Sequence, residues 1–86
     1  MTAINPKALL VGVHDSETSL IESYINKSNY IAECYRAKAN QEAIEFLAEN
    51  EFEIIIINSI LEDADGRDLI KYIRKTLNLN KPILVI

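Results

Sequence analysis

Apolar residues in this chain gather into short blocks separated by polar segments. Near-continuous apolar runs occupy residues 7–13 (KALLVGV), 54–57 (IIII) and 81–86 (KPILVI), and a shorter mixed run occupies 31–36 (IAECYR). A short apolar run bounded by polar residues is typical of a strand buried on both faces, as in a parallel sheet. The mixed run carries Glu33 and Arg36, which favours an edge strand where a charge can face water.

The segments between these runs carry apolar residues at helical spacing, and they predict three helices. The first should begin at an N-cap formed by Asp15 or Ser16. The second should run from about Asn40 to Asn50, and the third should follow Asp65 as its N-cap. The predicted apolar faces are Leu20, Ile21, Tyr24 and Ile25 in the first helix, Ala39, Ala43, Ile44 and Leu47 in the second, and Leu69, Ile70, Ile73 and Leu77 in the third.

Strands and helices therefore alternate strictly along the chain. This order predicts one α/β domain with a parallel sheet, right-handed crossovers and helices on both faces. We expect the strand order 2-1-3-4, with the first helix on one face and the second and third on the other.

Composition narrows the class of protein further. The chain has 86 residues, 49% of them hydrophobic and 26% charged, which is ordinary for one small globular domain. Its net charge of −4 argues against non-specific contact with nucleic acid, and no apolar run is long enough to span a membrane. The single cysteine, Cys34, excludes an internal disulfide, and a reducing cytoplasm is the simplest setting.

Candidate chemistry lies where the strands end. Asn58 directly follows the isoleucine run, and His14 and Asp15 follow the first strand. In an open α/β sheet, ligands bind outside the carboxyl ends of the strands. We therefore expect these three side chains to cluster at that edge.

Three segments of the sequence resemble the receiver domain of two-component response regulators. They are LLVGVHDSETSL, AKANQEAIEFL and FEIIIINSILEDADGRDLIKYIRK, and the D-x-D-G that ends at Gly66 is among the most specific pieces. The likeness runs from Lys7 to Ile86. It implies a flavodoxin-like (CheY-like) doubly wound sheet, with residues 1–86 matching the N-terminal two thirds of a full receiver.

The same resemblance places differences at the positions that matter for chemistry. Receivers carry two adjacent acidic residues where this chain has His14 and Asp15, and an acceptor aspartate where it has Asn58. In the loop after the acceptor, Glu62 stands where proline is common, and Asp65 and Gly66 follow.

Phosphoryl transfer to a receiver needs a carboxylate nucleophile and a metal ion that neutralises the phosphoryl oxygens. An uncharged amide is a far poorer nucleophile, and Mg²⁺ is normally held by carboxylates. We therefore expect a pseudo-receiver with no catalytic residue, no cofactor, and Mg²⁺ binding at Asp15 that is weak or lost.

Each of these residues also has a structural interpretation. Asp15 can serve either as a helix cap or as a residual metal ligand, and His14 is more simply a polar loop residue. Asn58 should hydrogen-bond to the backbone of neighbouring loops. Asp65 and Gly66 should form a cap and a turn.

The leading interpretation is a non-enzymatic signalling module that acts through protein contacts with a histidine kinase, an output domain or another receiver. One alternative is a regulatory domain switched by a ligand or by a pH change at His14. An enzyme on a flavodoxin-like scaffold is disfavoured, because Gly12 and Gly66 are the only glycines and no nucleophile–base pair is evident.

A receiver continues past its fourth strand. The resemblance therefore predicts either that the polypeptide extends beyond Ile86 or that a second copy covers the fourth strand in a homodimer, and we expect the first. No direct contact with nucleic acid or membrane is expected from this segment.

Overall fold

Four parallel strands form the centre of the molecule. The structure is a computed structural model that describes residues 6–28 and 33–86. The strands are β1 (Lys7–Val11), β2 (Glu33–Ala37), β3 (Ile54–Ile57) and β4 (Ile83–Val85). Their order is β2-β1-β3-β4, and every neighbouring pair is parallel, so the predicted topology and the edge position of β2 are confirmed. Residues 31 and 32 of the predicted second strand lie outside the described residues.

The register of the two central strands brings their ends together. Val11 at the end of β1 is level with Ile57 at the end of β3. The next residues continue the hydrogen-bond ladder. The backbone amide of Asn58 donates to the Val11 carbonyl oxygen at 2.9 Å, and the backbone amide of Gly12 donates to the Ala37 carbonyl oxygen at 2.8 Å. Gly12 and Asn58 therefore leave the sheet at the same edge.

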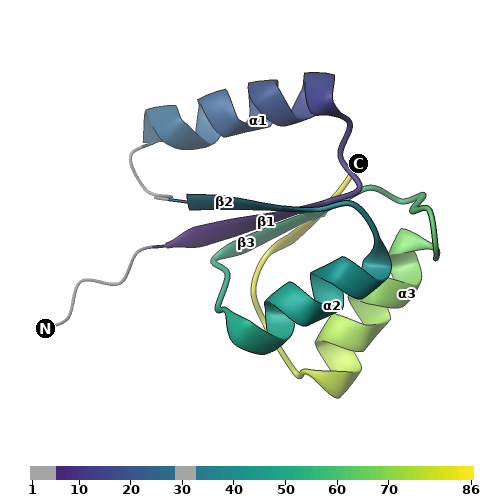
Figure 1. Ribbon diagram of the computed structural model, residues 1–86. Coiled ribbons are helices and arrows are strands. Elements are labelled where there is room, and N and C mark those ends of the chain that lie inside the picture. Colours follow the sequence, from purple (N-terminus) through teal and green to yellow (C-terminus); the bar gives the residue numbers. More distant parts are fainter. Residues whose placement is uncertain (1–5, 29–32) are drawn as a thin grey trace, which may run out of the picture.

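Helices cover both faces of this sheet (Figure 1). Helix α1 (Asp15–Ser28) lies on one face, and α2 (Asn40–Glu49) and α3 (Gly66–Lys71) lie on the other, as predicted. A short π-helix, η1 (Tyr72–Thr76), continues α3, and Asn78 with a φ of 54° follows it. Within the described ranges, the molecule has no helix with the length and apolar character needed to cross a membrane.

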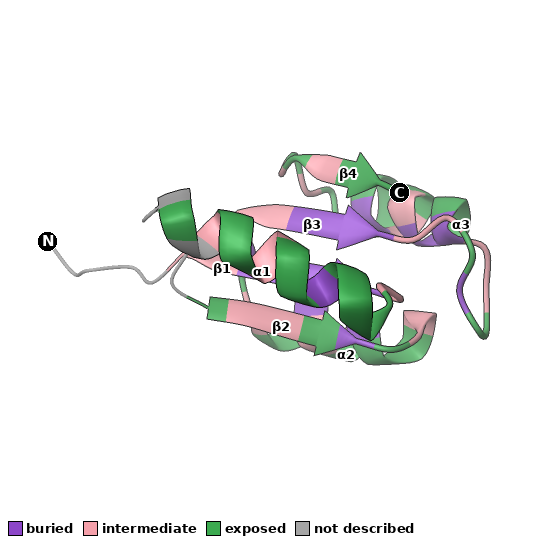
Figure 2. Ribbon diagram, turned by 90° about the horizontal axis from the view of Figure 1, so that it is seen from above, coloured by how far each residue is buried: buried purple, intermediate pink, exposed green. Residues whose placement is uncertain are grey.

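The larger part of the core lies between the sheet and α2 and α3. Ile55 and Ile57 are fully buried, and the C-terminal part of β3 is buried throughout (Figure 2), as is most of β1. The Tyr35 ring meets both Phe46 and Phe52 edge-on, with centroids 5.4 Å apart in each pair. Leu69 and Ile73 of the third helical segment are buried against this cluster, as predicted.

The prediction for the apolar face of α1 is half wrong. Ile21 and Ile25 pack on Ala8 and Leu10 of β1, but Leu20 is 65% exposed and Tyr24 is 74% exposed. The inward stripe instead includes Thr18. Its side chain can be buried because its hydroxyl group donates a hydrogen bond to the His14 carbonyl oxygen at 2.9 Å.

Candidate functional site

The loops that follow β1 and β3 meet at the carboxyl edge of the sheet and line one open depression. Its walls include His14, Asp15, Lys38, Asn58 and Glu62. The predicted clustering of His14, Asp15 and Asn58 is therefore confirmed.

Asn58 is held at both ends of its amide group. Its Nδ2 donates to the Gly12 carbonyl oxygen at 3.1 Å, and its Oδ1 accepts from the Ile60 backbone amide at 3.1 Å. The expected bonds to neighbouring loop backbone are thus present. One bond needs a donor and the other an acceptor, so the side chain that fills this place must carry both, as an amide does.

Close packing between Gly12 and Leu61 holds the loop after β1 against the loop after β3. Gly12 has a φ of +68°, a left-handed conformation that glycine adopts without strain. A Cβ at this position would lie 2.5 Å from a methyl carbon of Leu61, which is itself buried in the core. The β3 loop therefore rests directly on the β1 loop.

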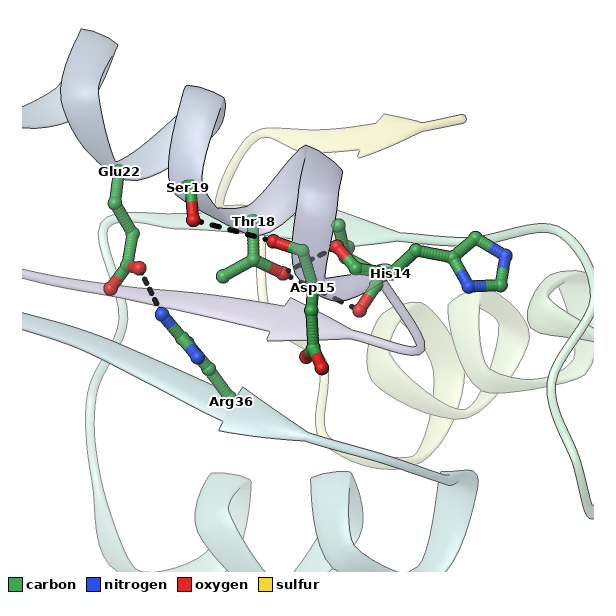
Figure 3. A network of polar contacts seen from close by, with 7 residues as sticks. His14, Asp15, Thr18, Ser19, Glu22 and Arg36 are labelled. Atoms are coloured by element: carbon green, nitrogen blue, oxygen red, sulfur yellow. Dashed lines mark hydrogen bonds and ion pairs between the residues drawn. The ribbon is translucent and has the colours of Figure 1, made fainter.

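His14 and Asp15 are both exposed, and Figure 3 shows their side chains leaving the backbone in different directions. The prediction that Asp15 or Ser16 is the N-cap is wrong by at least one residue, because α1 already includes Asp15 in its first turn. The His14 carbonyl oxygen accepts from the amides of Glu17 and Thr18 and so begins the helix. At the left of the same view, Glu22 and Arg36 form an ion pair between α1 and β2.

The three predicted residues of the β3 loop have separate roles. Glu62 is exposed and lines the depression. Asp65 instead caps α3, because its Oδ1 accepts from the Arg67 amide at 2.9 Å, and its Oδ2 pairs with the Arg67 side chain at 2.8 Å. The hydrogen bonds from Arg67, led by those of its side chain, lower the pKa of Asp65 to about 2.

Gly66 is buried against the end of β3. Its amide donates to the Ser59 carbonyl oxygen at 2.9 Å, and a Cβ at this position would overlap the Asn58 carbonyl oxygen. The predicted cap and turn at Asp65 and Gly66 is therefore confirmed. It fixes where α3 starts relative to Asn58.

Two further residues of this edge were missed from the sequence. Lys38 follows β2 and brings a positive charge to the depression, and its position after a strand end could have marked it. Asp63 reaches the start of α2, where its Oδ1 accepts from the Asn40 amide at 2.8 Å and its Oδ2 from the Gln41 amide at 3.2 Å. These bonds, the Asn40 bond foremost, lower the pKa of Asp63.

The depression holds carboxylates, but they are not gathered around one point. In the part of the chain that the structure describes, no three His, Cys, Asp or Glu residues are placed to hold a metal ion together. Receivers carry acidic residues at the positions of His14 and Asp15, and here only Asp15 has a carboxylate. The Oδ1 atom of Asn58 already accepts a hydrogen bond from a backbone amide.

Solved structures that share this fold are receiver domains of response regulators. No protein-family model matches the sequence, and no curated protein matches it significantly. The MaeR response regulator bound to beryllium trifluoride superposes with a TM-score of 0.84 at 18% identity, over 94% of this chain and 66% of MaeR. The Francisella response regulator 1452 receiver domain gives 0.72 at 27% identity, over 94% of this chain and 64% of that one.

The HemR receiver domain from Leptospira biflexa gives a TM-score of 0.75 at 25% identity, over 93% of this chain and 62% of that domain. This chain thus spans between 62% and 66% of the length of the three structures. Its fold is the CheY-like receiver fold, as the sequence resemblance implied.

Proposed function

We propose that this domain is a signalling module of the receiver type that acts through protein contacts and takes no phosphoryl group at Asn58. The fold and its receiver neighbours support a role in signal transduction. The observation that carries the proposal is the amide of Asn58, which is hydrogen-bonded through both its nitrogen and its oxygen.

The bonding of Asn58 opposes phosphoryl transfer in two ways. The amide carries no negative charge, and its Oδ1 faces the Ile60 amide, which competes with any electrophile for that oxygen. A carboxylate in the same orientation would place an oxygen beside the Gly12 carbonyl oxygen, where the amide now donates. The surroundings of position 58 therefore suit an amide better than an acceptor carboxylate.

The residues at this edge do not fit the Mg²⁺ site that receivers use. Mg²⁺ requires near-octahedral oxygen ligands and is usually bound through one or two carboxylates plus phosphate oxygens. Here Asp15 contributes a single exposed carboxylate, and the side chain of His14 points away from it (Figure 3). We propose that Mg²⁺ binds weakly or not at all, and that the domain catalyses no reaction.

The proposed partners are proteins. Receiver structures with this fold include the beryllofluoride-activated NtrC4 receiver domain dimer, which shows that a receiver can present its surface to a second copy. For this chain we propose a histidine kinase, an output domain or another receiver as the class of partner, within the cytoplasm.

Beryllium trifluoride and acetyl phosphate test the proposal directly. The protein is incubated with each reagent and Mg²⁺, and amide chemical shifts and intact mass are recorded. We expect no shift change at residues 12–15 or 58–62 with beryllium trifluoride, and no adduct of about 80 Da with acetyl phosphate. A phosphorylatable receiver treated in parallel shows that the reagents are active.

Two results would contradict the proposal. One is a hydroxylamine-labile adduct mapped to Asn58 or to a neighbouring carboxylate. The other is a saturable shift change around Asn58 that requires both Mg²⁺ and beryllium trifluoride.

A further inference from the structure

The first amides of helix α2 are not capped by the residue at its own N-cap position. Its N-cap residue is Ala39, whose φ of −145° and ψ of 172° are extended and whose side chain makes no capping hydrogen bond. The first amides of a helix have no partner within the helix, so they need an acceptor from elsewhere. That acceptor comes from a different part of the fold.

Asp63 supplies it from the loop at residues 59–65, between β3 and α3. The two bonds from Asn40 and Gln41 cross 23 and 22 residues of sequence, whereas an ordinary N-cap bond spans two or three. A carboxylate is also favoured there by the helix dipole. The charge and the geometry therefore both hold the tip of the loop against α2.

The rest of the loop is tied to the sheet. Leu61 is buried beside Gly12, its amide donates to the Ala64 carbonyl oxygen at 3.1 Å, and Ser59 accepts from Gly66 at 2.9 Å. The loop therefore has two anchors, one on the core below Leu61 and one on α2 through Asp63.

We propose that Asp63 is a latch that couples the loop at residues 59–65 to the start of α2, so that loop and helix change conformation together. Lys38 immediately precedes Ala39 and lines the same depression as Glu62 of the loop. A partner that displaces the loop must uncap α2, and a partner that holds the start of α2 also fixes the loop. This inference does not depend on whether Asn58 accepts a phosphoryl group.

The test separates capping of the helix from coupling of the loop. Asp63→Ala removes the latch, and Glu62→Ala removes the neighbouring exposed carboxylate as a control with the same change of charge. A second variant, Asp63→Ala with Ala39→Asp, gives α2 a local cap in place of the distant one. Amide exchange is measured at Asn40 and Gln41, and amide nitrogen relaxation is measured for residues 59–65.

In Asp63→Ala we expect exchange at Asn40 and Gln41 to be about fivefold faster, the factor that corresponds to losing a typical N-cap. Order parameters in the loop should fall from about 0.85 towards 0.6. Adding Ala39→Asp should restore slow exchange at Gln41, the second amide of the helix, which an N-cap side chain can reach, while the loop stays mobile. Glu62→Ala should change neither reading.

Two outcomes overturn the proposal. If the loop in Asp63→Ala is as ordered as in the wild type, the core anchor at Leu61 is sufficient and Asp63 is only a helix cap. If Ala39→Asp restores the order of the loop as well, the effect passes through helix stability and no direct coupling exists. Unchanged exchange of the β1 amides shows that each variant is folded.

Discussion

Replacing Asn58 with aspartate is the most informative single change in this domain. The substitution restores the residue type that a phosphorylatable receiver has at this position. It also exchanges the Nδ2 group, which donates to the Gly12 carbonyl oxygen at 3.1 Å, for a second acceptor. We expect Asn58→Asp to destabilise the protein at neutral pH and not to restore phosphorylation.

The size of the effect follows from the two hydrogen bonds. Losing the bond to Gly12 removes about 1 kcal/mol. Two half-buried acceptors left facing each other add a desolvation and repulsion cost of about 1–3 kcal/mol. The Ile60 amide bonds more strongly to a carboxylate, which offsets part of this loss. We expect a net decrease of about 2 kcal/mol in the free energy of unfolding at neutral pH.

The pH dependence gives the prediction its sharpest test. A protonated carboxyl can again donate to Gly12, so the new group should have a folded-state pKa above its unfolded value. Its penalty is then absent below the unfolded pKa, about 3.9, and develops as pH rises through the folded pKa. Urea unfolding followed by far-UV circular dichroism should therefore show a larger loss at neutral pH than at about pH 4.

Asn58→Ala provides the control, because it removes both hydrogen bonds without adding a charge. Its loss of stability relative to the wild type should be the same at both pH values. An Asn58→Asp variant at least as stable as the wild type at neutral pH would refute the reasoning. So would a penalty that does not change with pH.

Three further predictions concern the same edge. Gly66→Ala should lower the free energy of unfolding by about 2–3 kcal/mol in urea titrations, because its Cβ overlaps the Asn58 carbonyl oxygen; a neutral substitution would mean that the turn can shift. Because the pKa of Asp65 is lowered to about 2, its stabilising effect is present above about pH 4 and is lost as pH falls through about 2. Urea midpoints should fall over this range, and less steeply in Asp65→Asn; equal slopes would contradict the role of the Arg67 contacts. The double variant His14→Asp/Asn58→Asp should bind Mg²⁺ at least tenfold more tightly by calorimetry than Asn58→Asp alone, since each carboxylate adds a ligand; equal affinities would show that loop geometry, not residue type, limits the site.

The central strands and the place of Asn58 could be predicted from the sequence because local pattern determines them. Ile54–Ile57 has no polar alternation, so it must be covered on both faces, and the structure gives β3 the same bounds. Once β3 is central and parallel to β1, the residue after Ile57 must lie beside the end of β1. The bonds of Asn58 to Gly12 and Ile60 follow from that position.

Features that depend on the path of a loop or on one side of a helix could not be predicted in this way. Leu20 and Tyr24 continue an apolar stripe in sequence, but the sheet face below α1 accommodates only the adjacent stripe. Thr18 is polar in sequence and becomes buried only because a carbonyl oxygen satisfies its hydroxyl. The bonds from Asp63 to α2 join segments more than twenty residues apart, and no local pattern indicates them.

The hydrogen bonds around Asn58 also affect how readily this residue undergoes deamidation. An asparagine followed by a small residue such as Ser59 loses its amide when the next backbone nitrogen attacks the side-chain carbonyl carbon. Here the Ser59 amide donates to the Ile86 carbonyl oxygen at 2.9 Å, and both ends of the Asn58 amide are held. Attack would require all three bonds to break together. The folded state thus protects this side chain from deamidation, a spontaneous reaction whose products are aspartate and isoaspartate.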